Sequence, residues 1–484
     1  MNYSDEGNRG GLAEGSLGFK YLLAESIALT APIGAALGTL LGSAQFALGA
    51  FPLAVLVAMV VTVFWVNTPY QFSKKIAGAG GFYHYGAEAV GPGYGTVVGW
   101  FYLLNYFFFI APGGIFIFGL ILPTVLGQLG FTAYPGWLWL PANAAYIMGL
   151  FALAYFGIRP SLKYSLVASG LEIAFLLFFS VYVIAHSPAA PLAFTTSFSP
   201  TGISGVLLGA VYGFTAVSGI SGTVYLGEEA KAPLKNVRNA IIISFGLTAL
   251  VFVLTSYAMT VGWGVANMGS FASSGVPGII LSDKYLGLAG LIVISVLVLN
   301  SVFAGGLAPL IASARLLFSM ARDNVIPSSL SKVNRHRSPG VALFVLAVAA
   351  VLISTVSGLA LGVEGGFVFM LLLAGVGSLV AHVLGSVALP TYFRKSGSFN
   401  TILHLVFPVV FLVSAVLVTY SLFFPFVFPV YLGPVIAGIW AAIAVWLVTR
   451  GKKNMPNWST VGRAPIRETP AHVAAQETPQ DQPV

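Results

Sequence analysis

Long apolar segments, nearly free of charge, run through most of this chain and leave few folds open to it. A helix needs about 20 apolar residues to cross the roughly 30 Å hydrocarbon core of a bilayer. Hydrophobic residues make up 57% of the 484 positions and charged residues only 7%, whereas an ordinary soluble domain has roughly 25% charged residues. Because every backbone polar group in lipid needs a partner within the protein, runs of this length predict helices rather than the strands of a barrel. The sequence therefore predicts an all-α integral membrane protein.

Twelve windows of this kind are separated by polar breaks. Their approximate limits are 21–43, 48–70, 94–126, 137–157, 163–186, 204–227, 238–262, 286–320, 340–360, 366–390, 400–423 and 427–449. The map divides the chain into an N-terminal segment (1–20), a core of ten helices (21–390), two peripheral helices (400–449) and a tail (450–484). Because the tail is rich in Pro, Gln and Thr, we expect it to be disordered.

The Lys and Arg residues fall almost entirely on one side of this map. Of the 22 basic residues only Lys284 lies on the other side, and an excess of basic residues marks the cytoplasmic loops of membrane proteins. We therefore expect a multi-pass protein of the cell membrane, embedded in the lipid bilayer, with both termini in the cytoplasm. The net charge of +8 then reflects how the chain is oriented in the membrane, and we expect no nucleic-acid partner.

The first window contains an interruption where a helix should be most regular. The stretch ALTAPIGAALG, residues 28–38, places Pro32 and Gly34 at its centre. Proline removes a backbone donor, and no water in the bilayer interior would satisfy the groups that it frees. Such a segment is either a simple kink packed through small residues, or a true break that is buried in protein or lines a cavity.

The sixth window contains a second interruption, TAVSGISG, residues 215–222. Windows one and six each begin a set of five, at about 21–186 and 204–390. Interrupted helices in corresponding positions are typical of secondary transporters built from inverted repeats, whose binding site lies where the broken helices meet. Free N–H groups at such a break attract a carboxylate, and free carbonyl groups attract an ammonium group. A zwitterionic amino acid carries both.

Three further stretches carry a family resemblance. They are GEEAKAPLKNVRNAI (227–241), RLLFSMARDNVIP (315–327) and GAGGFYHY (78–85). In their order among the twelve windows they resemble the amino acid, polyamine and organocation (APC) superfamily of secondary transporters. The resemblance implies the fold of the leucine transporter, a LeuT-like 5+5 inverted repeat in which helices 1 and 6 are discontinuous, with helices 11 and 12 outside it.

The resemblance also implies alternating access around a substrate held between the two breaks. The substrate carboxylate would meet the backbone of Ile33, Gly34 and Ala35, next to Thr30 and Ala31. Carbonyl groups of both breaks would accept the ammonium group. The second break would contribute Phe214, which is a candidate aromatic lid together with Tyr212, and also Thr215, Ala216, Ser218 and Gly219.

Glu172 lies near the middle of the fifth window, where an ionisable group is costly and usually functional. Some similar transporters have a lysine at about this position in place of a sodium ion, so the resemblance suggests that an acid here is a proton carrier that couples transport. The alternative is a glutamate that only forms structural hydrogen bonds with neighbouring helices.

Charged residues near the basic side are candidates for a gate. Glu228 and Glu229 follow the sixth window and would reach Arg315 or Arg322, forming an ion pair that breaks on opening. Solvated helix ends are the alternative. Glu25, before the first break, would pair with a base, take part in proton movement or have a structural role.

The sequence offers no support for an enzyme or an ATP-driven pump, because it lacks cysteine and the GxxxxGK[ST], HExxH and GxSxG motifs. We expect no cofactor and no metal site. The sequence predicts a permease for amino acids or related amines that works by symport with a proton, or with a sodium ion. An amino acid/amine antiporter and an ion channel are the alternatives.

Overall fold

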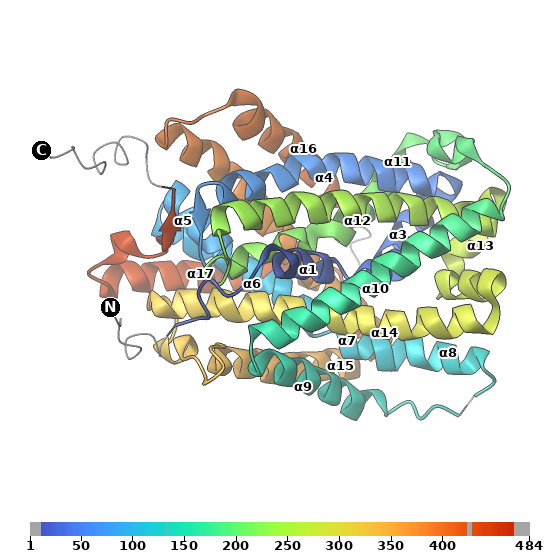
Figure 1. Ribbon diagram of the computed structural model, residues 1–484, viewed down its shortest axis with the longest axis horizontal. Coiled ribbons are helices and arrows are strands. Elements are labelled where there is room, and N and C mark those ends of the chain that lie inside the picture. The colour runs from blue at the N-terminus through green and yellow to red at the C-terminus, as the bar shows by residue number, and fades with distance from the viewer. Residues whose placement is uncertain (1–10, 132, 424–427, 469–484) are drawn as a thin grey trace, which may run out of the picture.

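The computed structural model describes residues 11–131, 133–423 and 428–468. In this part the chain is almost entirely helical and contains two short strands. Long helices run side by side along one axis and form an elongated bundle, while shorter helices and turns lie at its ends (Figure 1). The predicted all-α class is confirmed.

The elements follow one another along the described chain in two sets. The first set comprises α1 (Phe19–Thr30), α2 (Pro32–Gly34), η1 (Ala35–Thr39), α3 (Leu40–Ala47), η2 (Leu48–Ala50), α4 (Phe51–Ser73), β1 (Ile76–Ala77), α5 (Phe82–Ala89), α6 (Pro92–Ile110), α7 (Gly113–Ile115), η3 (Phe116–Ile121), α8 (Leu122–Gln128), α9 (Trp139–Tyr155), α10 (Ile158–Ala185), η4 (Pro191–Phe194) and η5 (Thr196–Phe198). The second set comprises α11 (Ile203–Val217), η6 (Ser218–Leu226), α12 (Pro233–Trp263), η7 (Val265–Asn267), α13 (Met268–Ser273), α14 (Pro277–Arg322), η8 (Ser328–Ser331), α15 (Gly340–Lys395), η9 (Ile402–Val406), α16 (Phe407–Phe423), α17 (Leu432–Asn454), η10 (Trp458–Thr460) and β2 (Ile466–Arg467).

Nine helical segments in the described residues are long and apolar enough to cross a membrane, and α9 is a shorter apolar helix. Two of the nine hold two predicted windows each: the segment Phe19–Ser73, and α15, which bends at Gly362. The twelve windows therefore lie mainly on helices, and their order fits a LeuT-like arrangement.

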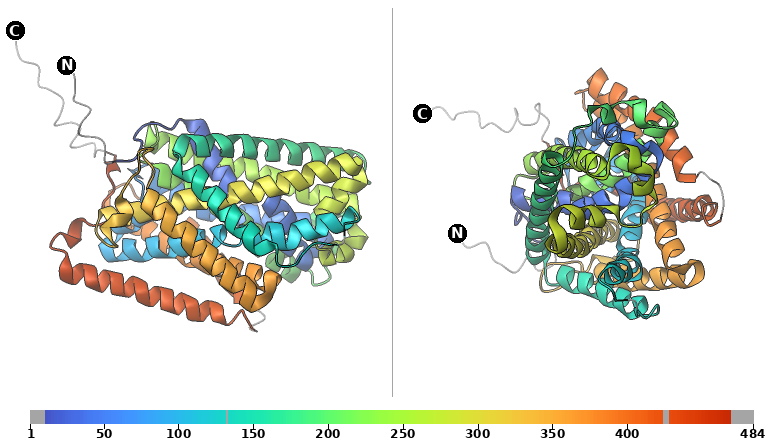
Figure 2. Two further views of the ribbon diagram at one scale, coloured as in Figure 1. Left: turned by 90° about the horizontal axis from the view of Figure 1, so that it is seen from below. Right: turned by 90° about the vertical axis from the view of Figure 1, so that its right-hand side faces the viewer.

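Helix α1 lies in the middle of the bundle in Figure 1, where it contacts α10, α12, α14 and η6. The last two long helices, α16 and α17, lie on the outside (Figure 2). The first helix is thus surrounded by protein, which allows it to carry an interruption that lipid would not tolerate.

Most basic side chains gather at one end of the bundle, which we call the basic end. It is marked by Lys75, Arg159, Arg322, Lys395 and Arg467, whose side chains bond to the loops and helix ends there. Lys284 instead donates to the Gly262 carbonyl near the last turn of α12. Helix α12 starts near the basic end, and its 31 residues span about 46 Å at 1.5 Å per residue. The structure therefore separates Lys284 from the other basic residues, as the sequence indicates.

Residues 455–468 form an ordered segment at the basic end that we call the C-terminal strap. Its strand β2 pairs with β1 in antiparallel fashion, with Ala77 opposite Ile466. Helix α17 also continues to Asn454. The sequence predicted disorder from residue 450 onward, and for residues 450–468 that prediction is wrong. Composition carries no information about the hydrogen-bond partners that β1 and α5 supply. Residues 469–484 lie outside the described residues.

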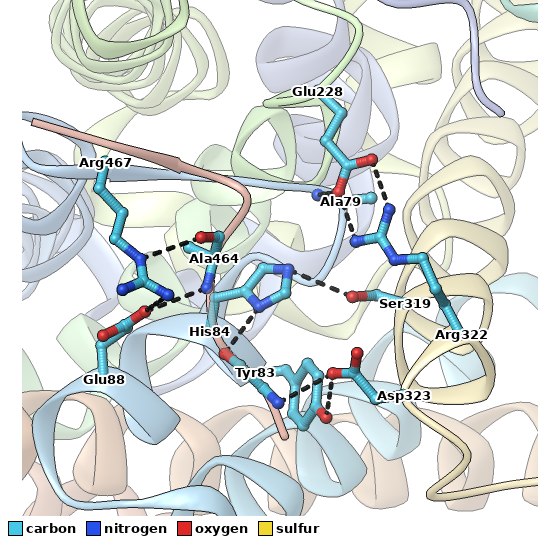
Figure 3. A network of polar contacts seen from close by, with 11 residues as sticks. Ala79, Tyr83, His84, Glu88, Glu228, Ser319, Arg322, Asp323, Ala464 and Arg467 are labelled. Atoms are coloured by element: carbon cyan, nitrogen blue, oxygen red, sulfur yellow. Dashed lines mark hydrogen bonds and ion pairs between the residues drawn. The ribbon is translucent and has the colours of Figure 1, made fainter. Parts of the chain in front are cut away.

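The strap is bonded to α5 and to Asp323, the residue that follows α14 (Figure 3). The Gly462 N–H donates to Asp323 Oδ2 at 2.8 Å, and the Gly462 carbonyl accepts from His84 Nδ1 at 2.9 Å. The Ser319 hydroxyl lies 3.2 Å from His84 Nε2. A carbonyl only accepts, so Nδ1 carries the proton. Burial lowers the pKa of His84, which favours this neutral tautomer.

Glu88 of α5 is the main side-chain anchor of the strap. Its Oε1 accepts the Ala464 N–H at 3.1 Å and lies 2.8 Å from Arg467 Nη2. An ion pair this exposed contributes at most about 1 kcal/mol, but the backbone hydrogen bond adds to it.

We expect Glu88→Ala to loosen the strap without unfolding the bundle. Hydrogen–deuterium exchange of residues 462–468 should become several-fold faster, because the substitution removes two of the strap's bonds. Arg463→Ala is the matched control, because Arg463 is exposed and has no ion pair in the described residues. Unchanged protection in Glu88→Ala would contradict this anchoring role.

Candidate functional site

The first helix is broken at Ala31. This residue has a φ of 44°, in the left-handed region, and its N–H closes the last turn of α1 on the Ala28 carbonyl at 2.9 Å. Pro32 then starts a new helix, where its fixed φ is favourable and its missing N–H leaves no donor unsatisfied. The α conformation is also disfavoured for a residue that precedes proline. The helix therefore ends and restarts, which is a break rather than a simple kink.

The second break lies directly beside the first. Helix α11 ends at Val217 and continues as the tighter turns of η6, which contact α1. A Cβ atom on Gly219 or Gly222 would overlap the Leu29 side chain. These two glycines thus allow the close approach of the two interrupted helices.

The N–H groups that follow the first break are all engaged within the protein. The Ile33 N–H donates to Glu172 Oε2 at 3.2 Å, the Gly34 N–H to Ser301 Oγ at 3.0 Å, and the Ala35 N–H to the Ala31 carbonyl at 2.7 Å. These are the three groups that the family resemblance assigns to a substrate carboxylate. A bound carboxylate would therefore have to replace Glu172 and Ser301.

Glu172 joins the break to two neighbouring helices. It is fully buried on α10, and it accepts the Ser301 hydroxyl at 2.6 Å and the Asn300 amide at 3.0 Å, both from α14. The Tyr164 hydroxyl in turn donates to Asn300 Oδ1 at 2.8 Å. The carboxylate thus lies where the N–H groups of a restarting helix favour an anion.

Hydroxyl groups at the two breaks bond to their own helices. The Thr30 hydroxyl donates to the Ile27 carbonyl at 2.7 Å, and the Ser218 hydroxyl donates to the Thr215 carbonyl at 2.9 Å. Ala216 is buried and contributes no polar side-chain group. The Thr215 carbonyl, one of those expected to meet a substrate ammonium group, therefore already accepts two hydrogen bonds, from the Ser218 hydroxyl and the Ser218 N–H.

The two aromatic candidates for a lid point to different neighbours. Phe214 is buried and packs edge-on to Trp65, with ring centroids 6.2 Å apart, and to His382 at the same separation. Tyr212 stacks on Phe46, with centroids 5.7 Å apart. Phe214 is the candidate that faces the interior.

Two arginines of α14 hold the segment that follows η6. Arg315 bonds to both carboxylate oxygens of Glu229, and both residues are almost completely buried. Arg322 bonds to both oxygens of Glu228 at 2.8 Å. The contacts suggested by the sequence are therefore present, and their role as a gate stays a prediction.

The Glu228 carboxylate is also bonded to the loop before α5 (Figure 3). Its Oε1 accepts the Ala79 N–H at 3.0 Å. Burial acts to raise the pKa of Glu228, but the hydrogen bonds and charge of Arg322 outweigh burial and lower it. Glu228 is thus held in its charged form.

Glu25 has a different environment from the other two acids. It is fully buried on α1, and neither carboxylate oxygen has a hydrogen-bond partner in the part of the chain that the structure describes. It lies within electrostatic reach of Arg315 and Glu229, but Arg315 is bonded to Glu229. The expected pairing of Glu25 with a base is therefore not formed.

A group of three tyrosines was not identified from the sequence, and one of them, Tyr106, lies within electrostatic reach of Glu25. Tyr102 and Tyr106 of α6 and Tyr225 of η6 are fully buried, with neighbouring ring centroids 5.5 to 6.2 Å apart. The available signal was the spacing of Tyr102 and Tyr106, four residues apart on one helix face. Their contact with Tyr225 depends on how α6 and η6 pack, which this spacing does not give.

The surface of the bundle adds no second candidate among the described residues. No group of three or more His, Asp or Glu residues is placed there to hold a metal ion. A cavity of about 440 Å³ is lined by residues such as Pro123, Tyr134 and Val363, and it includes none of the residues at the two breaks.

Comparison with known proteins identifies the family of this chain. A family model described as amino acid permease matches residues 22–449. A branched-chain amino acid permease, BcaP, of Bacillus subtilis is 27% identical over 75% of this chain and 79% of its own length. A mitochondrial cationic amino acid transporter 3 of Arabidopsis thaliana is 26% identical over 66% of this chain and 54% of its own length. A low-affinity putrescine importer, PlaP, of Escherichia coli is 25% identical over 58% of this chain and 61% of its own length. The family model covers most of the chain, and the protein therefore belongs to the amino acid permease family of the APC superfamily.

Proposed function

We propose that this permease moves amino acids or related amines across the cell membrane by alternating access, as a proton-coupled symporter. The observation that carries the proposal is the direct contact of the two interrupted helices, because the backbone N–H and carbonyl groups at such breaks suit a zwitterion that displaces their present partners. The names of the relatives, which refer to branched-chain and cationic amino acids and to putrescine, support a substrate with an amino group.

Coupling is proposed to run through Glu172. Its carboxylate binds the Ile33 N–H and the Ser301 hydroxyl, so a substrate carboxylate competes with it for the same donors. When the substrate carboxylate takes these donors, the buried Glu172 carboxylate is left without hydrogen bonds. Protonation of Glu172 then removes the cost of burying its charge. Substrate and proton would then bind together.

The basic end is proposed to face the cytoplasm, because basic residues favour that side. The ion pairs of Glu228 with Arg322 and of Glu229 with Arg315 then lie at the cytoplasmic side and close it. Both described ends of the chain lie there too, since Gly15 and Glu468 bond to residues of this end.

Gly219→Ala should reduce substrate uptake by about tenfold or more, because a methyl group at this position collides with Leu29 and such overpacking costs about 1–3 kcal/mol. Uptake into proteoliposomes measures the effect, with thermal unfolding as a check on folding. Gly246→Ala is the matched control, because a Cβ atom at Gly246 meets nothing. Normal uptake by Gly219→Ala would contradict the proposed site.

Glu172→Gln should abolish accumulation driven by an imposed pH gradient but preserve exchange across the membrane, because glutamine keeps an acceptor for Ile33 and cannot release a proton. Wild-type uptake should rise as the outside is acidified between about pH 8 and pH 5, and the variant should lose this dependence. Glu364→Gln, a change at an exposed glutamate, is the control.

Uptake and current measurements on the same proteoliposomes decide among the alternatives. Transport by Glu172→Gln that keeps its pH dependence refutes the proton role. Uptake that follows an imposed sodium gradient favours sodium coupling, and uptake that requires preloaded internal substrate favours an antiporter. Currents that do not saturate with substrate indicate a channel.

Glu228→Gln should favour opening of the basic end, because Arg322 loses its charged partner. In a chain without cysteine, Thr223→Cys provides one buried thiol on η6 whose alkylation reports opening. We expect alkylation about tenfold faster, from the loss of charge-assisted hydrogen bonds. Glu14→Gln, at an exposed acid of the same end, should have no effect. Equal alkylation rates in all three backgrounds would rule out this gate.

A further inference from the structure

Three buried charged groups near the first break do not balance. Glu25, Glu229 and Arg315 are 0%, 0% and 2% exposed, which places two carboxylates beside one guanidinium group. Arg315 uses its Nε and Nη2 groups on Glu229 and its Nη1 group on the Ile311 carbonyl. An unpaired buried carboxylate is costly. Glu25 therefore lacks a positive partner.

The tyrosine hydroxyl groups near Glu25 also lack partners. Tyr106 lies within electrostatic reach of Glu25. The hydroxyls of Tyr102, Tyr106 and Tyr225, together with Ser221, form no hydrogen bond among the described residues. Ser221 lies beside the Tyr102 and Tyr106 hydroxyls, and the Tyr225 hydroxyl lies beside the Phe82 backbone, but none of these contacts has complete hydrogen-bond geometry. Buried polar groups in native proteins nearly always have a partner, so a carboxylate and several hydroxyls left unpaired in one group, connected through Tyr106, indicate a missing ligand.

The chemistry of this group of residues identifies the kind of ligand. A carboxylate and several hydroxyl oxygens are acceptors, and an alkylammonium group carries three N–H donors. Aromatic faces also attract such a cation. A primary ammonium group fits this set, because its three donors can pair with the carboxylate and with one or two of the hydroxyls.

We propose that the Glu25 cluster, made of Glu25, Tyr102, Tyr106, Ser221 and Tyr225, binds the distal ammonium group of a cationic amino acid or a diamine. The inference rests on the proposed function, because it takes the substrate site to lie at the breaks. Glu25 precedes Ala31 by six residues, or about 9 Å along α1. A substrate whose amino acid group lies at the break would reach Glu25 with an extended side chain.

The test is equilibrium binding to the purified full-length protein, with lysine and 1,4-diaminobutane as cationic probes and leucine as the neutral probe. Glu25→Gln should weaken binding of the cationic probes by at least about tenfold, from the loss of a charged hydrogen-bond acceptor, and leave leucine binding unchanged. Tyr106→Phe should weaken the cationic probes several-fold. Glu25→Asp keeps the charge and should restore part of the affinity.

Three outcomes overturn the inference. They are equal losses for leucine and the cationic probes in Glu25→Gln, no loss for any probe, and a wild-type protein that binds leucine but neither cation. Glu364→Gln is the matched control, since it removes an exposed carboxylate. If Gly219→Ala abolishes binding of all probes while Glu25→Gln changes none, the Glu25 cluster is refuted and the proposed function stands. If Gly219→Ala binds every probe normally, the proposed function fails as well.

Discussion

The hydrogen bond from the Ile33 N–H to Glu172 is the interaction on which the centre of this permease depends. A helix that stops at Ala31 and restarts at Pro32 leaves N–H groups that water cannot reach in a bilayer. Glu172 and Ser301 satisfy them from α10 and α14. This solution makes the break stable without ligand and places an exchangeable anion where a substrate anion would bind. The same contacts therefore explain the stability of the interruption and, under the proposed function, its use.

The buried charges of the permease fall into two kinds. Arg315 with Glu229 and Arg322 with Glu228 are complete pairs, each with two bonds, and they connect α14 to the segment after η6. Glu25 is incomplete. A completed pair holds two elements together, whereas an unpaired buried carboxylate is stable only when it is protonated or meets a cation. The arrangement thus separates groups that fix one conformation from a group that responds to what is bound.

Much of the fold could be predicted from sequence. Hydropathy indicates which segments are helical, and the positions of Lys and Arg indicate which loops lie on the same side of the bilayer. Pro32 and Gly219 marked the two breaks, since each changes the backbone locally. The partners of Glu172, the unpaired state of Glu25 and the meeting of Tyr102, Tyr106 and Tyr225 depend on the rotation and register of packed helices. Apolar helices that are hydrophobic on every side carry little periodic signal for that rotation. The order of the C-terminal strap was missed for a related reason, because its bonds are mainly backbone to β1 and α5.

The pairing of β1 with β2 has a consequence for biosynthesis. Strand β1 is made after the second predicted span, whereas β2 follows α17, so β1 leaves the ribosome long before its partner does. The edge of β1 stays open through the insertion of every intervening helix. Final assembly of the basic end is therefore a post-insertion event, and a nascent chain stalled before the strap would be complete in its membrane helices but unfinished at that end.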